Sequence, residues 1–340
     1  MSTTSFVTGG TGFIGSRLVK RLLADGHTVR LLARSPEKAR ALFDDEVEII
    51  PGDLGDLEAL ARGCRGADRV FHLAAQVGDF GPRRGYYETN VQGTRAVVDA
   101  ADRANAGCLV YVSTNAVTGM RRTSVTDESA PYADTGGHYG ISKGMAERII
   151  RDRHHQNGFP GVILRPPIVY GPGSVNWVLR PLGLMKQGKM VLIDKGRGFC
   201  WHVFVENLVD AALLAASHKK APGEVFIVGD GKDDTTWGDY FNLLAATAGY
   251  GPVTKNVPKR LAVAVAHVSY GLYSAFGIRP KLTPLGVGIL TSGAPVSIQK
   301  ARTVLGYKPR VDLDGGMRRV GEWLKVEAPE YLNSTGGPSR

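Results

Sequence analysis

Thr8-Gly9-Gly10-Thr11-Gly12-Phe13-Ile14-Gly15 follows a short β-type run and precedes a helical pattern. Three of its glycines, Gly10, Gly12 and Gly15, have the spacing G-x-G-x-x-G. Glycines at this spacing let the backbone turn sharply, approach a pyrophosphate and direct a helix N-terminus toward it, although glycine-rich turns also have purely structural uses. Because the motif lies between the first strand and the first helix, it predicts a dinucleotide site that comprises Gly9, Gly10, Thr11, Gly12, Phe13, Ile14 and Gly15.

The rest of the first half alternates short apolar runs with longer helical patterns, such as residues 14–23 with one apolar face. Strands that alternate with helices form βαβ units. The pattern therefore predicts an α/β fold with a Rossmann-type, doubly wound parallel sheet. The predicted strands are short, aliphatic or β-branched, and bounded by Gly, Asp, Asn or Pro: residues 5–8, 28–32, 47–50, 69–73, 109–113 and 162–165.

The second half is less regular and is interrupted by Pro and Gly. Strand-like runs at residues 190–193 and 224–228 alternate with helical patterns at 207–216 and 238–248. We predict a dinucleotide-binding domain over residues 1–167, with its sheet completed by later segments near 200–230. A smaller C-terminal substrate-binding region is expected over 168–326, and a flexible tail over 327–340.

Composition limits the partners and the compartment. The 340 residues carry 42 Lys and Arg against 32 Asp and Glu, a formal net charge of +10. With no long basic run, a phosphate-bearing small molecule explains this charge better than nucleic acid. Cys64, Cys108 and Cys200 are odd in number and far apart, so neither a disulfide framework nor a zinc site is expected. We therefore expect no bound metal. Because the cysteine content gives no disulfide framework and the polar start lacks a signal segment, we expect a cytoplasmic protein.

The end of the second predicted strand bears on the choice of cofactor. An acidic residue at this position hydrogen-bonds the ribose 2′-hydroxyl of NAD, whereas Arg accommodates the 2′-phosphate of NADP. Here the strand leads into Arg34 and Ser35, and the first carboxylate is Glu37. The sequence therefore favours NADP over NAD, with a solvated basic turn as the alternative.

A second polar turn follows the third predicted strand. Asp53, with Leu54 after it, lies where a carboxylate can meet the adenine amino group. A turn-forming Asp explains the same position equally well.

Tyr139 and Lys143 open the next candidate site. Residues four apart share a helix face, so the two side chains converge on one substrate. A tyrosine that works near neutral pH needs its pKa lowered by about 3 units, which a close ammonium and a positive nicotinamide ring supply in a desolvated site. Ser113 and Thr114 add hydroxyl groups at the end of the preceding strand, where doubly wound sheets bind their ligands.

At this point the chain resembles the extended branch of the short-chain dehydrogenase/reductase superfamily. The matching segments cover about residues 5–172 and are, in order, 8–15, 52–54, 72–75, 90–94, 113–114, 139–143 and 165–172. A looser resemblance to 3β-hydroxysteroid dehydrogenase and dihydroflavonol reductase-like members continues through 205–211 and 300–307, to about residue 324.

The resemblance implies roles for individual residues. Tyr139 would be the general acid/base, and Lys143 would lower its pKa and hold the nicotinamide ribose. Thr114 would hydrogen-bond the substrate oxygen, with Ser113 as the alternate for this role. Further cofactor-binding positions implied by the resemblance are Leu73, Ala74, Ala75, Asn90, Pro166 and Ile168.

The activity implied is that of an NADP-dependent ketoreductase or secondary alcohol dehydrogenase for a hydrophobic ketone or alcohol. The resemblance also implies a homodimer. A sugar-nucleotide epimerase with tightly bound NAD uses the same triad, and a cofactor-binding sensor without catalysis has the same fold, so both remain alternatives. Dehydration is not expected, because Ser113-Thr114-Asn115-Ala116 lacks the Asp-Glu pair of the dehydratases. The predicted substrate contacts are Val77, Phe80, Asn115 and Tyr170; ordinary loop packing explains Phe80 equally well.

Residues 261–278 form an apolar window without Asp, Glu, Lys or Arg. Leu261, Val265, Val268, Leu272 and Phe276 recur at helical spacing, and basic residues flank the window on both sides. Three alternatives fit this pattern: a membrane span, an interfacial helix that associates weakly with a membrane, and a helix that lines the substrate pocket. We favour the pocket-lining helix, because a lipophilic substrate needs apolar walls.

Overall fold

The computed structural model describes residues 2–119, 125–134, 137–231, 234–280 and 282–333. Within these residues, seven parallel strands form one sheet in the order β10-β6-β5-β4-β1-β2-β3. The chain starts in the middle of the sheet, moves out to one edge and then returns to build the other, which is the doubly wound topology predicted from the sequence. The strands are β1 (Thr4–Thr8), β2 (Thr28–Ala33), β3 (Glu48–Pro51), β4 (Arg69–His72), β5 (Cys108–Val112), β6 (Gly161–Arg165) and β10 (Val225–Ile227).

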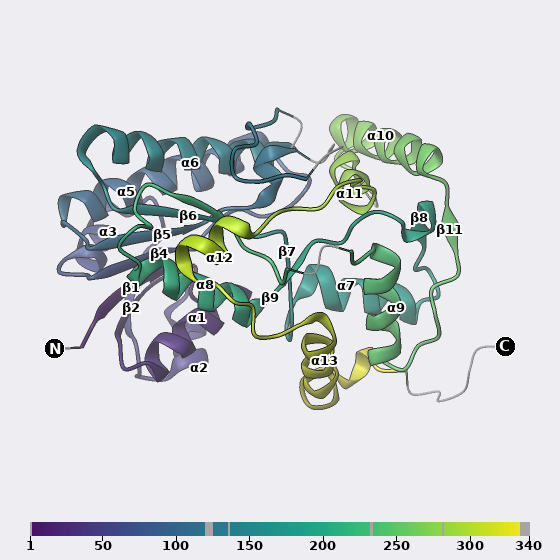
Figure 1. Ribbon diagram of the computed structural model, residues 1–340, viewed down its shortest axis with the longest axis horizontal. Helices are drawn as coiled ribbons and strands as arrows, with labels where there is room; N and C mark the ends of the chain where they lie inside the picture. Colours follow the sequence, from purple (N-terminus) through teal and green to yellow (C-terminus); the bar gives the residue numbers. More distant parts are fainter. Residues whose placement is uncertain (1, 120–124, 135–136, 232–233, 281, 334–340) are drawn as a thin grey trace.

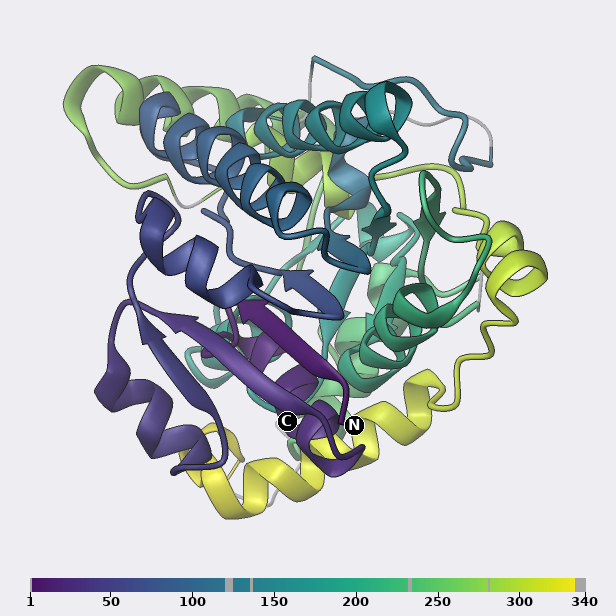
Figure 2. The same ribbon diagram turned by 90° about the vertical axis from the view of Figure 1, so that its left-hand side faces the viewer.

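Helices cover both faces of this sheet, as the two views in Figures 1 and 2 show. All five residues of β5 are buried, and so are all five of β6, because both faces of a parallel sheet are packed against helices. One face carries α1 (Phe13–Ala24), α2 (Pro36–Phe43), α8 (Val205–Ser217) and α12 (Gln299–Leu305). The other carries α3 (Leu57–Cys64), α5 (Gly93–Arg103) and α6 (Gly137–Asn157).

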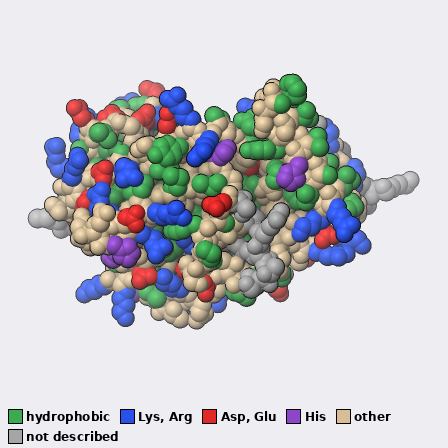
Figure 3. Space-filling model, turned by 90° about the horizontal axis from the view of Figure 1, so that it is seen from above, with side chains coloured by type: hydrophobic (Ala, Val, Ile, Leu, Met, Phe, Trp, Pro, Cys, Tyr) green, Lys and Arg blue, Asp and Glu red, His purple; other side chains and the backbone are tan. Residues whose placement is uncertain are grey.

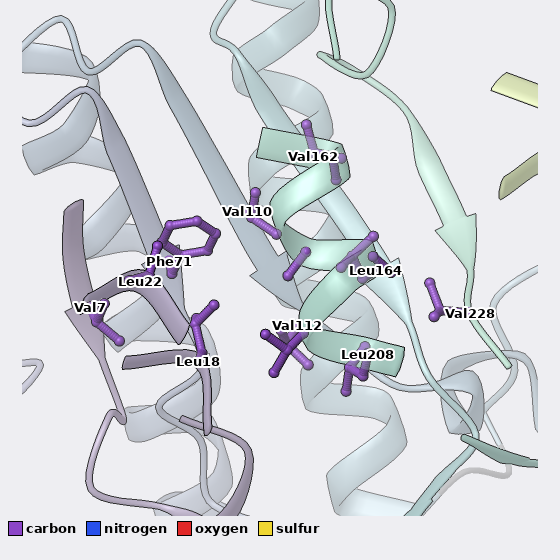
Figure 4. Close-up of a cluster of buried hydrophobic side chains, with 14 of the residues drawn as sticks. Val7, Leu18, Leu22, Phe71, Val110, Val112, Val162, Leu164, Leu208 and Val228 are labelled. Atoms are coloured by element: carbon purple, nitrogen blue, oxygen red, sulfur yellow. The ribbon is translucent and has the colours of Figure 1, made fainter. Parts of the chain in front are cut away.

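The apolar core on the α1 side joins segments that are far apart in the sequence. Val7, Phe71 and Val110 project from neighbouring strands toward Leu18 of α1 and Leu208 of α8 (Figure 4). These side chains are almost completely buried. Helix α8 and strand β10 thus pack with the seven-stranded sheet, although they follow the irregular middle of the chain.

A second apolar cluster forms the core of the smaller region. It joins α7 (Arg180–Lys186), α9 (Trp237–Thr247) and α13 (Leu313–Glu327) around Tyr170 and Trp237. This part of the chain also contains two short pairs of parallel strands. One pair is formed by β7 (Ile168–Tyr170) and β9 (His202–Phe204), and the other by β8 (Leu192–Ile193) and β11 (Asn256–Val257). The predicted strand at 190–193 is therefore shorter than expected, because only its last two residues pair.

A pair of helices lies at the upper right of Figure 1, at one end of the smaller region. They are α10 (Lys259–Phe276) and α11 (Pro284–Leu290), and a small buried cluster of Ile193, Ala262, Ala266 and Val287 holds them. Helix α10 ends at Gly277, whose φ of +69° is in the left-handed region that glycine adopts without strain. Shorter helices complete the fold: α4 (Arg83–Tyr86), π-helical turns at Tyr87–Gln92 and Val175–Leu179, and 3-10 turns at Asn115–Thr118, Asp194–Gly196 and Pro329–Tyr331.

Candidate active site

The glycine-rich loop makes a tight turn between β1 and α1. The backbone N–H of Gly12 donates to the Gly9 carbonyl at 3.0 Å, and Gly9 has a φ of +77°. A Cβ on Gly9 would lie 2.6 Å from the backbone nitrogen of Ala74 at the end of β4. Gly15 has equally little space, since its Cβ would collide with the backbone of Gly9 and Gly10. The loop therefore requires glycine at these positions and is held against the carboxyl end of β4.

The loop also leaves the start of α1 open to an anion. Helix α1 begins at Phe13, and within the described residues no side chain caps it and no acidic residue occupies its first turn. The first amides of a helix carry a partial positive charge and need acceptors. This cradle of glycines and helix amides fits the pyrophosphate of a dinucleotide. The structure thus brings together the predicted loop residues from Gly9 to Gly15.

At the end of β2, Arg34 is exposed and directed to solvent. Ser35 is the N-cap of α2: its hydroxyl accepts from the backbone N–H of Lys38 at 3.3 Å and donates to the Glu37 carboxylate at 3.1 Å. Backbone and Ser35 hydrogen bonds lower the pKa of Glu37. Among the described residues, Arg34 forms no ion pair, whereas the Ser35 side chain is already used to cap α2.

The turn after β3 is built by two aspartates. Asp53 accepts a hydrogen bond from the N–H of Gly55 at 2.8 Å, and Asp56 caps α3 through the N–H of Ala59 at 2.9 Å. Asp53 is thus a turn-forming residue, as one of the two sequence interpretations held, and its exposed carboxylate also stays open to a ligand. Leu54 packs against α5, where a Cβ on Gly93 would lie 2.7 Å from its Cδ1.

A buried chain of hydrogen bonds runs from β1 through β4 to α5. His72 is bonded to the Thr8 hydroxyl at 2.7 Å through Nδ1 and to the Thr94 hydroxyl at 3.0 Å through Nε2. Burial, and then the Lys143 charge, lower the pKa of His72 to about 3. His72 is therefore neutral and structural. The Thr8 hydroxyl is 3.4 Å from the N–H of Ala74, so the chain also holds the segment after β4.

Asn90 fastens this same segment to α6. Its amide oxygen accepts from the N–H of Gln76 at 2.7 Å, and its amide nitrogen donates to the Gln76 carbonyl and to the Ser142 hydroxyl. The side chain is buried and fully used in these bonds. Asn90, predicted as a cofactor contact, is therefore a bridge between protein groups that positions the segment with Leu73, Ala74 and Ala75.

Lys143 is buried in the first half of α6. Its ammonium donates to the Val112 carbonyl at the end of β5 at 2.7 Å and lies 4.1 Å from the centre of the Tyr111 ring. Burial lowers the pKa of Lys143 to about 7, and the Glu147 carboxylate one helical turn later partly opposes this shift. The helix thus places an ammonium at the carboxyl edge of the sheet, as predicted.

Tyr139 lies one turn before Lys143, and its phenol is close enough to the Thr114 side chain for that side chain to affect its pKa. Thr114 also caps the short 3-10 turn that starts at Asn115, accepting from the N–H of Ala116 at 3.2 Å. Burial raises the pKa of Tyr139 to about 12, and the Thr114 side chain opposes the rise. The Lys143 ammonium donates to the Val112 carbonyl. A lowering of the Tyr139 pKa by Lys143 together with a bound nicotinamide ring stays a prediction.

Ser113 has a different partner from Thr114. Its hydroxyl donates to the Glu147 carboxylate, which is also held by Arg165, with 2.6 Å between Nη2 and Oε2, and by the Tyr132 hydroxyl at 3.0 Å. Glu147 and Arg165 are almost completely buried. Of the two predicted hydroxyl residues, the structure brings Thr114 to Tyr139 and Ser113 to this buried ion pair. The sequence analysis missed Glu147, although its spacing of four from Lys143 is a usable signal.

The predicted substrate contacts are spread over different surroundings. Val77 is 59% exposed, and Phe80 packs edge-on against Tyr273 of α10 with ring centres 5.6 Å apart. Asn115 is buried, and its N–H donates to the Pro166 carbonyl at 2.9 Å. Tyr170 is a correction: it is completely buried in the second core, against His202, Phe204 and Tyr240. Ile168, predicted near the cofactor, is buried in the same cluster.

Several aromatic side chains contact one another near Tyr139. The Tyr86 hydroxyl donates to the Phe80 carbonyl at 2.9 Å, and the Tyr86 ring lies 6.2 Å from the ring of His138. Phe80 in turn contacts Tyr273, and the Thr283 hydroxyl donates to Asp79 at 2.5 Å. The segment after β4 is thus connected to both helices of the α10–α11 pair, next to the catalytic candidates.

A Rossmann-type sheet with a glycine loop, and a Tyr-Lys pair at its carboxyl edge, are features of a nicotinamide-dependent enzyme. Residues 5–229 match the model of the NAD dependent epimerase/dehydratase family. The chain belongs to this family, which is the extended branch of the short-chain dehydrogenase/reductases.

Curated relatives of similar length are oxidoreductases. The chain is 30% identical over 331 residues to a 2-alkyl-3-oxoalkanoate reductase of Shewanella oneidensis, which covers 93% of this chain and 85% of the relative. It is 31% identical over 318 residues to a 4-hydroxy-2-methyl-3-oxo-4-farnesyl-3,4-dihydroquinoline-1-oxide ketoreductase of Stigmatella aurantiaca, with 92% and 94% covered. A 3 beta-hydroxysteroid dehydrogenase/Delta 5-->4-isomerase of Mycobacterium tuberculosis is 30% identical over 321 residues, with 89% and 85% covered.

Among solved structures, the crystal structure of gox2253 has a TM-score of 0.80 at 27% identity and covers 98% of this chain and 100% of its own. The fold, the family and these relatives together identify the chain as a dehydrogenase or reductase that uses a nicotinamide cofactor.

Proposed function

We propose that the protein is an NADP-dependent ketoreductase or secondary alcohol dehydrogenase for a hydrophobic ketone or alcohol. The observation that carries the proposal is that Tyr139 of α6 lies close to the Thr114 side chain just after β5, with Lys143 one turn further along α6. Two hydroxyl groups that meet at the carboxyl edge of a doubly wound sheet are placed to share one substrate oxygen.

The cofactor would bind along the carboxyl edge of the sheet. The loop from Gly9 to Gly15 and the first amides of α1 would hold its pyrophosphate. Exposed Arg34 at the end of β2 would meet the 2′-phosphate of NADP, and no carboxylate precedes Glu37 there. The bound nicotinamide supplies or accepts the hydride. Lys143, whose ammonium donates to the Val112 carbonyl, is a buried cation at this edge.

The protein's own residues handle the proton. Because the pKa of Tyr139 is raised to about 12, its hydroxyl is protonated at neutral pH and is ready to donate to a ketone oxygen. Thr114 would hold that oxygen through a second hydrogen bond and so stabilise the negative charge that develops on it.

The class of substrate follows from the approach to Tyr139 and from the relatives. Phe80, Tyr86 and Tyr273 give this approach an aromatic character. The named relatives act on oxoalkanoates, on a farnesylated quinoline oxide and on hydroxysteroids, which are all largely apolar molecules. We infer a hydrophobic ketone or secondary alcohol.

The proposal is tested by Tyr139→Phe in NADPH oxidation assays with 2-alkyl-3-oxoalkanoates and 3-ketosteroids. Loss of the proton donor should reduce kcat about a hundredfold or more. Tyr250→Phe removes the hydroxyl of a half-buried tyrosine at the border of the second core and should have no effect. Near-normal turnover by Tyr139→Phe would reject the assignment. Purified protein that carries non-exchanging NAD and interconverts sugar nucleotides would identify an epimerase instead.

A further inference from the structure

We propose that the outer face of α10 docks on the surface of an anionic phospholipid membrane. The α10 face consists of Leu261, Val265, Val268, Leu272 and Phe276, which recur every three or four residues on one side of the helix. Their side chains are 42% to 73% exposed. Five large apolar side chains on one exposed stripe are unusual for a surface that meets only water.

The structure turns this stripe away from the rest of the protein. Within α10, only Ala262 and Ala266 are buried, and they pack with Ile193 and Val287. Figure 1 shows α10 at the outer edge of the molecule, and Figure 3 shows hydrophobic side chains spread over the corresponding right-hand lobe. The predicted pocket-lining role is therefore wrong for these five residues. The opposite face of α10 carries the small side chains of Ala262 and Ala266 and packs against the rest of the protein.

The charges around the α10 face point to an anionic partner. Lys259 and Arg260 open the helix, and Arg279 follows its end. The whole stretch from residue 240 to residue 311 contains no Asp or Glu. Basic residues at the ends of an apolar stripe are attracted to anionic lipid headgroups, while the stripe enters the boundary between headgroups and acyl chains.

A second copy of the chain fits this face less well. Two α10 faces packed together would place the basic ends of one helix next to basic ends of the other, whether the helices run parallel or antiparallel, because both ends are basic. Like charges at such an interface oppose association. In the described part of the chain, no helix has the length and apolar character to cross a membrane. The α10 face therefore fits a helix that lies on a bilayer.

The inward side of the same helix leads to the catalytic candidates. Tyr273 contacts Phe80, and Phe80 is connected through Tyr86 to the surroundings of Tyr139. A protein docked through α10 would hold this approach close to the lipid surface. This last step rests on the proposed function, because it gives a lipophilic ketone a short path from the bilayer to Tyr139.

The test is flotation of the full chain with phosphatidylcholine vesicles that contain phosphatidylserine, and with pure phosphatidylcholine vesicles as the neutral comparison. We expect the wild type to float with the anionic vesicles and less with the neutral ones. Combining Leu272→Ser with Phe276→Ser should weaken association about a hundredfold, because each large apolar side chain transferred from water contributes about tenfold or more. Lys259→Gln with Arg260→Gln should weaken binding to the anionic vesicles about fivefold for each residue.

The matched control is Leu57→Ser with Val326→Ser, which removes two exposed apolar side chains from α3 and α13 and should float like the wild type. Flotation requires no turnover, so its result is independent of the proposed function. A wild type that remains at the bottom of the gradient with anionic vesicles would overturn the proposal. The proposal would also be overturned if the wild type formed a dimer that the Leu272→Ser, Phe276→Ser variant did not form, and neither protein floated with the vesicles.

Discussion

The Arg165 guanidinium holds the Glu147 carboxylate in a buried ion pair, with 2.6 Å between Nη2 and Oε2 and both residues almost inaccessible to water. Ser113 and Tyr132 complete the hydrogen bonds to the carboxylate. Since Glu147 lies one helical turn after Lys143, the pair also connects the ammonium of the candidate site to the interior of the fold. The ion pair thus determines how the first half of α6 sits against β5 and β6.

We predict that Glu147→Gln lowers the free energy of unfolding by about 3–5 kcal/mol, because it leaves the Arg165 charge buried without a counter-ion. Urea denaturation measures this difference. Glu88→Gln, which breaks the exposed pair with Arg84, should cost less than about 1 kcal/mol. Equal losses of unfolding free energy in the two variants would show that the buried pair stabilises the fold no more than the exposed pair does.

The glycine loop permits a prediction with a closely matched control. Gly9 and Gly26 have φ values of +77° and +79°, but a Cβ would meet the backbone of Ala74 at Gly9 and open space at Gly26. Both alanine variants should pay the left-handed strain of about 1–2 kcal/mol. Only Gly9→Ala should also weaken NADPH binding, by about tenfold or more, in a fluorescence titration. An unchanged dissociation constant for Gly9→Ala would place the pyrophosphate elsewhere.

Cofactor preference is predicted to depend on Arg34. Replacement by Asp should remove a charge-assisted phosphate contact worth about 1.5–3 kcal/mol and reverse the preference from NADPH to NADH. Isothermal titration with both cofactors measures the change. Arg318→Asp on α13 makes the same change of charge at a distant exposed position and should preserve the preference. Tighter binding of NADH by the wild type would mean that Arg34 is only a solvated surface charge.

Lys143 should make stability depend on pH. Its pKa is lowered from 10.5 to about 7 in the folded protein, so between these values the unfolded chain binds more protons than the folded one. This group therefore adds stability as the pH rises from about 7 to about 10.5, by up to about 5 kcal/mol. In urea titrations over this range, the free energy of unfolding of the wild type should increase with pH relative to that of Lys143→Met. A constant difference would show that the ammonium keeps its ordinary pKa in the fold.

The resemblance also predicts a homodimer formed through α5 and α6. These two helices are already joined within one chain by Arg153, which pairs with Asp99 and Asp102. They therefore form one rigid surface that a second copy can meet. Light scattering at micromolar concentration should give twice the mass of the chain, and a mass of one chain would exclude this assembly.

Most of the fold and part of the site follow from local patterns. The loop from Gly9 to Gly15 and the Tyr139–Lys143 pair were predicted because their spacing within a turn or a helix decides their geometry. Glu147 and Arg165 lie on different elements, and only the folded sheet shows that they meet. Periodicity identified the stripe on α10, but it does not say whether protein or solvent covers that stripe. Tyr170 was misassigned because a short strand position near the site was taken to face the site rather than the second core.

The most direct test of the proposed hydride and proton transfer is the fate of deuterium from NADPH that carries deuterium at both hydrogen positions of the nicotinamide C4, followed by mass spectrometry of the product. With wild-type protein and a hydrophobic ketone, we expect an alcohol that carries one deuterium on the carbinol carbon, and its formation should be at least about a hundredfold slower with Tyr139→Phe. An alcohol formed without the label, or formed equally fast by Tyr139→Phe, would contradict the account.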